Sequence, residues 1–128
     1  LVGSEMCIRD SVPPAPSVEI RLGIPDESLT VGPLQALVDT GADVSIVPLR
    51  YIEPLSVPVD NRKYLRSQWG DRRQVDVYLL DVGIGDIRLP LVEIVADERG
   101  SEVILGRDVL NKLVVTLDGP QRVLEILN

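Results

Sequence analysis

The chain has 128 residues, with 20 acidic and 13 basic side chains, a net charge of −7 and no histidine. This length suits one domain with its own core. The negative charge argues against nucleic-acid binding, because phosphates are repelled unless a concentrated basic patch is present. Without histidine there is no imidazole for a catalytic triad or a typical zinc site, and the single Cys7 excludes an internal disulfide. We therefore expect no metal and no cofactor, which leaves carboxylate chemistry.

Aromatic side chains are scarce, with one Trp, three Tyr and no Phe. Valine, leucine and isoleucine must therefore fill the core, and the β-branched residues among them favour strands, so we expect an all-β domain. No apolar run is long enough to cross a bilayer, and no charged-then-apolar leader is visible. On this basis we expect a soluble domain without membrane contact, with a cytoplasmic location as the default.

The N-terminal segment differs in composition from the rest. Residues 1–17 mix glycine, serine and charged side chains with three prolines, which interrupt any periodic pattern. We expect a disordered lead-in there, followed by a folded domain over residues 18–128. Residues 1–11 also resemble an adapter-derived peptide that recurs at the ends of environmental open reading frames, so Cys7 is assigned no function.

The first predicted strands lead to a carboxylate. Apolar and polar residues alternate over residues 17–22, as a half-buried strand requires. A second predicted strand, Leu34 to Val38, ends at Asp39, and an apolar run then resumes. A carboxylate at the end of a buried strand costs desolvation energy unless donors or a shared proton offset it, which favours a functional site. The alternative is a loop aspartate at a strand end, with Gly41 allowing a tight turn.

A predicted hairpin over residues 62–80 carries an unusual share of the positive charge. Its two strands flank the turn Gln68-Trp69-Gly70-Asp71. Five basic residues lie in this segment: Arg62, Lys63, Arg66, Arg72 and Arg73. Charge runs usually form solvated faces, so a hairpin with charged faces is the first interpretation. The alternative is a preference for acidic substrates.

The sequence after residue 80 predicts further strands and one helix. The nearly continuous apolar run over residues 89–96 indicates a strand buried on both faces. Residues 103–105 lead into Gly106 and the only substantial helix that we expect, over residues 107–113. Asp108 suits its first turn, because a carboxylate there meets unpaired N–H groups. A final hairpin over residues 114–127 leaves an edge that needs a partner.

Two motifs carry a family resemblance. They are Leu37-Val38-Asp39-Thr40-Gly41-Ala42-Asp43 and Ile104-Leu105-Gly106-Arg107-Asp108, followed by the turn Leu117-Asp118-Gly119-Pro120. In this order they resemble the retropepsin-like aspartic proteases, the retroviral-type family and its bacterial relatives, over about residues 18–127. The resemblance implies an all-β retropepsin-like acid protease half-barrel with a flap hairpin and one short C-terminal helix, functional as a homodimer.

The resemblance also implies roles for the motif residues. The catalytic group would be Asp39, Thr40 and Gly41, in which the Thr40 hydroxyl bonds across the dimer axis and the Gly41 N–H supports the carboxylate. Substrate would contact Ala42, Asp43 and the hairpin residues Gln68, Trp69 and Gly70. Structural support would come from Gly106, Arg107 and Asp108. For Asp43 and Arg107 the alternative is a surface ion pair that contributes little, and for Gly106 it is a helix-start glycine.

The chain supplies one candidate carboxylate where the chemistry needs two. An aspartic protease uses a pair of carboxyl groups that share one proton, one acting as base toward water and the other as acid toward the scissile carbonyl. Two copies related by a two-fold axis would place Asp39 against its symmetry mate. The expected partners are therefore a second copy and a peptide or unfolded protein substrate. A catalytically silent dimerisation or peptide-binding module on the same fold is the alternative.

Overall fold

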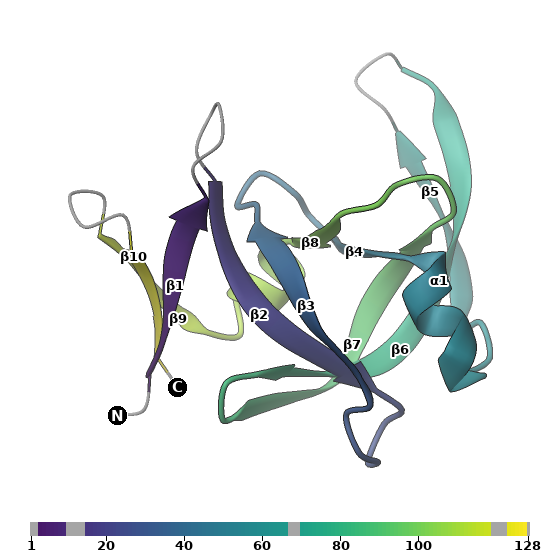
Figure 1. Cartoon of the computed structure of the whole chain (residues 1–128). Coiled ribbons are helices and arrows are strands. Elements are labelled where there is room, and N and C mark those ends of the chain that lie inside the picture. Colours follow the sequence, from purple (N-terminus) through teal and green to yellow (C-terminus); the bar gives the residue numbers. More distant parts are fainter. Residues whose placement is uncertain (1–2, 10–14, 67–69, 119–122, 128) are drawn as a thin grey trace.

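The computed structural model describes residues 3–9, 15–66, 70–118 and 123–127, with side chains at 16–66 and 70–113. These residues form ten strands, two short α-helices and one 3₁₀ turn (Figure 1). In chain order they are β1 (Gly3–Arg9), β2 (Ala15–Gly23), β3 (Val31–Val38), β4 (Ser45–Pro48), α1 (Leu49–Ile52), η1 (Glu53–Leu55), β5 (Asn61–Arg66), β6 (Arg72–Ile84), β7 (Ile87–Asp97), β8 (Val103–Leu105), α2 (Arg107–Leu110), β9 (Val114–Asp118) and β10 (Val123–Leu127).

Six of the strands close into a barrel. The order β6-β7-β4-β8-β3-β2 is completed by pairing of β2 with β6, at Arg21 to Gly23 against Asp81 to Gly83. The pairings β3–β8 and β4–β7 are parallel, and the others in the barrel are antiparallel. The all-β expectation is therefore confirmed, and closure leaves none of these six strands at an open edge.

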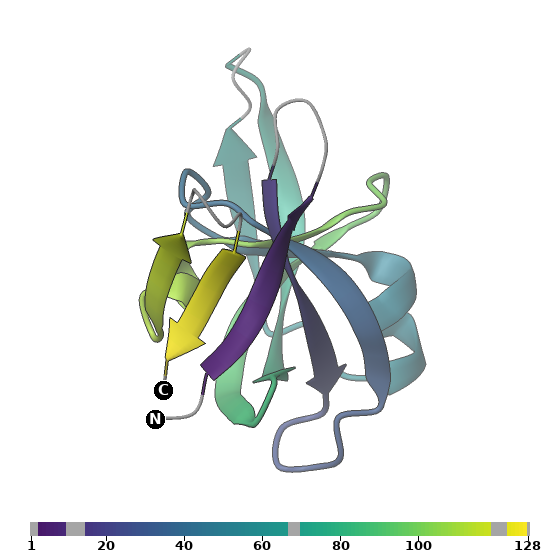
Figure 2. The same ribbon diagram turned by 60° about the vertical axis from the view of Figure 1, so that its left-hand side comes forward.

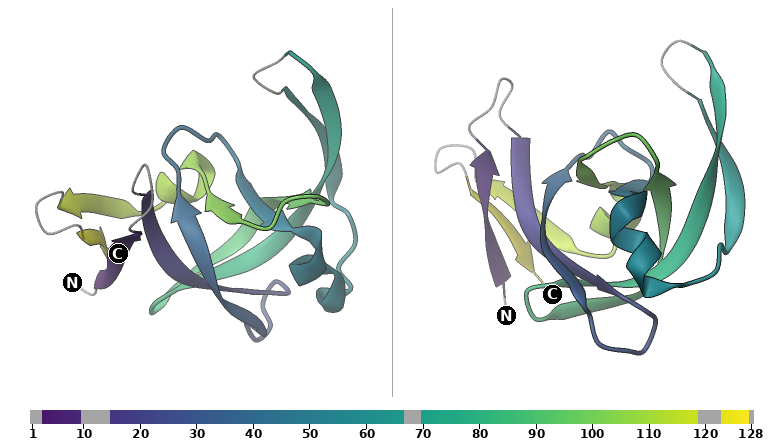
Figure 3. Two further views of the ribbon diagram at one scale, coloured as in Figure 1. Left: turned by 45° about the horizontal axis from the view of Figure 1, so that its top comes forward. Right: turned by 45° about the vertical axis from the view of Figure 1, so that its right-hand side comes forward.

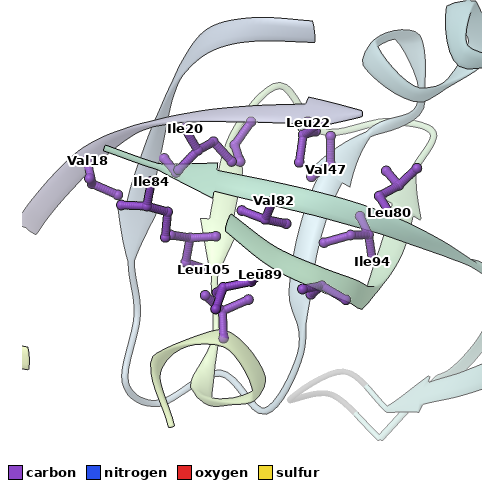
Figure 4. Packing of buried hydrophobic residues seen from close by; sticks show 14 of the residues in the cluster. Val18, Ile20, Leu22, Val47, Leu80, Val82, Ile84, Leu89, Ile94 and Leu105 are labelled. Atoms are coloured by element: carbon purple, nitrogen blue, oxygen red, sulfur yellow. The ribbon is translucent and has the colours of Figure 1, made fainter. Parts of the chain in front are cut away.

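The barrel interior is filled by aliphatic side chains, as the scarcity of aromatics predicted. Alternate residues of each strand point inward, and the long strands β6 and β7 contribute most of them (Figure 4). The largest fully buried side chains are Ile20, Leu22, Ile52, Leu80, Ile84, Ile94 and Leu105. Burying each of these contributes about 1.5–3 kcal/mol relative to leaving it exposed, so this core fixes the strands that carry the site.

The hairpin of β5 and β6 extends away from the barrel (Figures 1 and 2). Its strands pair from Asn61 opposite Val77 to Arg66 opposite Arg72. The hairpin expected over residues 62–80, where the resemblance implies a flap, is therefore present. Its turn residues Gln68 and Trp69 lie outside the described residues.

Three further strands continue the sheet beyond β2, in the order β2-β1-β10-β9. Strand β1 lies where the sequence suggested a disordered lead-in, and it pairs with β10 on one side and with β2 on the other. Because β10 is paired on both sides, the free edge that we expected at the last strand lies instead at β9. The boundary placed at residue 17 stays a prediction.

Two short helices lie outside the barrel. Helix α2 begins at Arg107, as the sequence indicated, but it ends at Leu110. Helix α1 and the 3₁₀ turn after it occupy a proline-rich stretch without a helical pattern. Helix α1 packs beside β4 and β7 (Figure 3), and the buried Ile52 and Leu55 join the core. Within the described residues, no helix combines the length and apolarity that a membrane crossing requires.

Candidate active site

The site begins where strand β3 ends. Strand β3 runs parallel to β8, and the Asp39 N–H continues their pairing by donating to the Leu105 carbonyl over 3.0 Å. The chain then turns, with the Ala42 N–H donating to the Asp39 carbonyl over 3.2 Å. The Gly41 N–H donates to the Asp39 carboxylate over 2.9 Å. These bonds hold the carboxylate of Asp39 at the surface, at the start of a short loop.

The alternation of strand side chains decides what surrounds Asp39. Ala36 and Val38 point into the barrel, so Leu37 and Asp39 share the outer face of β3. On the neighbouring β8, Val103 and Leu105 are likewise buried, which leaves Ile104 on that outer face. A groove of about 370 Å³ lies here, and we call it the Asp39 groove. It is lined by Pro16, Leu37, Val38, Asp39, Thr40, Glu102 and Ile104.

Glycine at position 106 allows the end of β8 to pass close to the Asp39 loop. A Cβ atom on Gly106 would lie 2.7 Å from the Val44 carbonyl carbon and 2.8 Å from the Ala42 carbonyl oxygen. Its φ of −95° is open to any residue, so glycine is needed for space rather than for backbone conformation. One residue later, the Arg107 N–H donates to the Ala42 carbonyl over 2.8 Å and ties the two segments together.

A buried hydrogen-bond network joins β4, β8 and α2 beneath the loop. The fully buried Ser45 hydroxyl donates to Asp108 Oδ1 over 2.7 Å and accepts from the Gly106 N–H over 3.0 Å. Asp108 also accepts from the N–H groups of Ser45 and Val109, at 3.3 and 2.8 Å. Sequence analysis missed Ser45. The available signal was a single small polar residue at an inward position of an otherwise apolar strand.

The other predicted site residues are distributed around this loop and the hairpin. Thr40 is exposed and lines the Asp39 groove, and Ala42 is half-buried. Asp43 forms an ion pair with Arg107, and both side chains are more than half exposed. Such an exposed pair contributes little to stability. Gly70 lies on the hairpin at a φ of +86°, with open space around it.

A second groove of about 270 Å³ separates the hairpin from the barrel. Its apolar wall is formed by Ile46, Leu65, Val75, Val95 and Ala96. Arg66, Arg73 and Asp97 stand around that wall. Ile46 belongs to β4, the strand that follows the Asp39 loop.

The basic side chains of the hairpin are mostly engaged within the chain. Arg62 pairs with Asp76 at 3.2 Å, Lys63 pairs with Glu93, and Arg73 pairs with Asp97 at 3.5 Å. The Arg72 guanidinium lies 4.7 Å from the centroid of the Tyr64 ring. These contacts favour a hairpin with solvated charged faces over a preference for acidic substrates.

Asp97 is held as an anion beside this hairpin. Burial raises the pKa of Asp97, but N–H groups of Gly100 and Arg99 and the Arg73 guanidinium outweigh that effect, so its pKa lies below the ordinary value. Arg73 therefore keeps its partner in mildly acidic solution. In the part of the chain that the structure describes, no three potential ligand side chains gather in a way that could hold a metal ion.

Comparison with known proteins identifies the family. A sequence profile of the family described as "gag-polyprotein putative aspartyl protease" matches residues 30–112, which include the whole Asp39 loop and strand β8 beneath it. The chain belongs to this family. No curated protein sequence matches it at a significant level.

Solved structures of retropepsins share the fold. A retropepsin-like aspartic protease from Rickettsia conorii superposes with a TM-score of 0.65 at 16% identity, covering 98% of this chain and 91% of that one. The EIAV protease, solved with the inhibitor HBY-793, gives 0.59 at 18% identity, covering 82% and 93%. The retroviral protease-like domain of Ddi1 from Leishmania major gives 0.54 at 21% identity, covering 88% and 89%. At these identities the likeness concerns the fold.

Proposed function

We propose that the protein is an aspartic endopeptidase, a hydrolase of peptide bonds that works as a homodimer. The observation that carries the proposal is the complete Asp39-Thr40-Gly41 loop, with its carboxylate exposed in a groove and supported by the Gly41 N–H at 2.9 Å. The family match over residues 30–112 supports the same chemistry. Its substrate would be a peptide or an unfolded segment of protein, because the flanking grooves suit side chains of an extended chain.

Two copies are needed because one chain presents one such loop. With a two-fold axis beside Asp39, the two carboxylates approach each other and share one proton. One then takes a proton from the attacking water, and the other gives a proton to the oxygen of the scissile carbonyl. Fixed donors such as the Gly41 N–H hold the carboxylate in place, so little reorganisation is needed during the reaction.

The remaining motif residues would position this pair. Thr40 lies next to the proposed axis and is exposed, so its hydroxyl is available to the second copy. Asp43 and Arg107 stand at the end of the loop, where the exposed carboxylate could meet the substrate main chain. Gly106, Ser45 and Asp108 hold the loop from below and act only through it.

The proposal is tested by cleavage of an unstructured protein in mildly acidic solution, with and without a pepstatin-type inhibitor. We expect proteolysis that the inhibitor suppresses and that Asp39→Asn abolishes, since the substitution removes the charge but keeps the shape. Asp86→Asn, an exposed carboxylate in the β6–β7 turn, is the matched control and should cleave normally. Undiminished proteolysis by Asp39→Asn would refute the assignment. A folded wild-type dimer without any activity would instead identify a silent binding module.

A further inference from the structure

A second carboxylate lies in the Asp39 groove, and neither the motifs nor the mechanism account for it. Glu102 immediately precedes β8, and the pairing of Val103 with Ala36 places it level with Gln35 of β3. Since Val103 and Leu105 point into the barrel, Glu102 and Ile104 fall on the outer face together with Leu37 and Asp39. The acid therefore shares the face that carries the catalytic carboxylate.

The surface between the two acids is apolar. Leu37 and Ile104 lie between Asp39 and the level of Glu102, and Pro16 forms a further wall. The two carboxyl-bearing residues are about 13 Å apart along the strand direction, because four residues of β structure separate their levels. A substrate side chain that enters beside Asp39 therefore passes over the apolar Leu37 and Ile104 side chains before it reaches Glu102.

The groove does not end at Glu102. An adjoining hollow of about 370 Å³ shares Leu37 and Glu102 with it and is otherwise lined by Ser17, Gln35 and Ser101. The Gln35 and Ser101 side chains offer oxygen acceptors to a donor group beside the Glu102 carboxylate. A long side chain with a polar head therefore has room at the far end of the Asp39 groove.

No basic side chain among the described residues neutralises this region. The linings of both hollows contain acidic but no basic groups. Arg50 reaches the neighbouring Ser101 carbonyl over 3.5 Å, but its guanidinium lies 4.6 Å from the Tyr51 ring centroid and also bonds the Tyr51 hydroxyl. Glu102 is exposed and available, and the net charge of −7 adds to the local negative potential.

We propose that the Asp39 groove receives a lysine or arginine side chain of the substrate, with the aliphatic stem on Leu37 and Ile104 and the cationic head at Glu102. This inference rests on the proposed function, since it names the substrate class for the same site. Lysine and arginine combine an apolar stem with a charged head, which matches an apolar floor that ends in a carboxylate. The preference is opposite to the acidic one that was the alternative interpretation of the hairpin charges.

The test uses peptide binding, so that it does not depend on turnover. Fluorescent octapeptides carry one variable residue, placed in turn at each position, as arginine, lysine, norleucine or glutamate. Their dissociation constants are measured by anisotropy on the full chain bearing Asp39→Asn, alone and combined with Glu102→Gln or Glu102→Lys. Asp86→Lys is the control, because it makes the same change of charge at an exposed turn outside the groove.

At one position we expect arginine and lysine to bind about fivefold to tenfold more tightly than norleucine, as for a partly exposed charge-assisted hydrogen bond. Glu102→Gln should remove this advantage, Glu102→Lys should reverse it in favour of glutamate, and Asp86→Lys should leave it unchanged. Equal binding of all peptides, absence of binding, or a basic preference that survives Glu102→Lys would each overturn the inference. Cleavage by the wild type is scored separately, so a protease without this preference refutes the inference alone.

Discussion

At the scale of single residues, the most constrained charge lies away from the catalytic loop. Asp81 is 1% exposed and accepts hydrogen bonds from Arg88 at 2.7 and 2.9 Å. It also accepts from the N–H groups of Asp26 at 3.1 Å and Leu91 at 2.9 Å. Asp26 and Leu91 both have a left-handed backbone conformation, with φ of +65° and +51°, which is unfavourable for residues other than glycine. One carboxylate thus stabilises two strained turns.

Replacing this carboxylate should destabilise the fold in a pH-dependent way. Burial alone raises the pKa of Asp81, but the Leu91 and Asp26 N–H groups and Arg88 outweigh it, so the pKa lies below its ordinary 3.8. A carboxyl group whose pKa is lower in the folded state than in the unfolded state stabilises the fold at pH values above its unfolded-state pKa. That stabilisation is lost as the pH falls through the folded-state pKa. We therefore expect Asp81→Asn to lower the free energy of unfolding by about 2–4 kcal/mol at pH 7.

The measurement is urea unfolding of wild type and Asp81→Asn at neutral pH and at several values down to about pH 3, near the ordinary pKa of an aspartate. The difference in the free energy of unfolding should shrink at the acidic end of this range. Asp86→Asn provides the exposed control and should change stability little at any of these values. A difference of constant size across the range would show that the charge of Asp81 is not responsible.

Individual residues differ in how far the sequence reveals them. Asp39 is predictable because a carboxylate interrupts an apolar strand and stands in a motif. Ser45 is not, since its importance depends on a hydrogen bond to Asp108, 63 positions later. Glu102 reads as an ordinary solvated acid before a strand. Its relation to Asp39 exists only because β3 and β8 are paired in parallel.

At the scale of elements, the site depends on how closely the catalytic loop and the end of β8 approach each other. The atoms that a Gly106 side chain would meet are backbone atoms of the loop, at Ala42 and Val44. Backbone cannot move aside as a flexible side chain can, so added volume must displace the loop that carries Asp39.

Gly106→Ala is therefore expected to lower the free energy of unfolding by about 2–3 kcal/mol, the cost of overpacking, and to reduce cleavage. Gly83→Ala is the matched control, because the added methyl meets only the end of the Leu29 side chain, which can rotate away. Thermal unfolding and a cleavage assay on both variants check the prediction. If Gly106→Ala were as stable and active as Gly83→Ala, the close approach would not be a requirement of the site.

Among the elements, those with a clean pattern were predictable. Alternation identified β2 and the return arm of the β5–β6 hairpin. The apolar run identified β7 as a strand, but it is not buried on both faces throughout, because Pro90, Leu91 and Glu93 are exposed. Helix α1 was missed because its four residues lie between prolines and show no full turn of pattern. Strand β1 was missed because its pairing with β10 joins segments more than 100 positions apart, a relation that local composition does not carry.

At the scale of the whole molecule, the insertion of β8 between β3 and β4 brings the two motifs together, and pairing of β2 with β6 closes the barrel around them. Strand β6 pairs with β2 near one end and with β7 along most of its length, and an irregularity between Leu80 and Val82 shifts the register of the β6–β7 pairing. Strand periodicity predicts neither this closure nor the insertion of β8 between β3, to which it is parallel, and β4, to which it is antiparallel. The sequence indicated that arrangement only through the resemblance of its motifs to a family.

The central claim is that the catalytic site needs one Asp39 from each of two copies. It is tested most directly by mixing: wild type is incubated with an equal amount of Asp39→Asn, well above the dimer dissociation constant and long enough for subunits to exchange. Random pairing leaves about half of the wild-type chains in wild-type dimers and the rest in mixed dimers, which have only one Asp39. We therefore predict that proteolysis falls to about half of that of the same amount of wild type alone. An equal amount of an unrelated, uncleaved protein should have no effect. Proteolysis that is unchanged by Asp39→Asn, although mixed dimers form, would contradict a site shared between two copies.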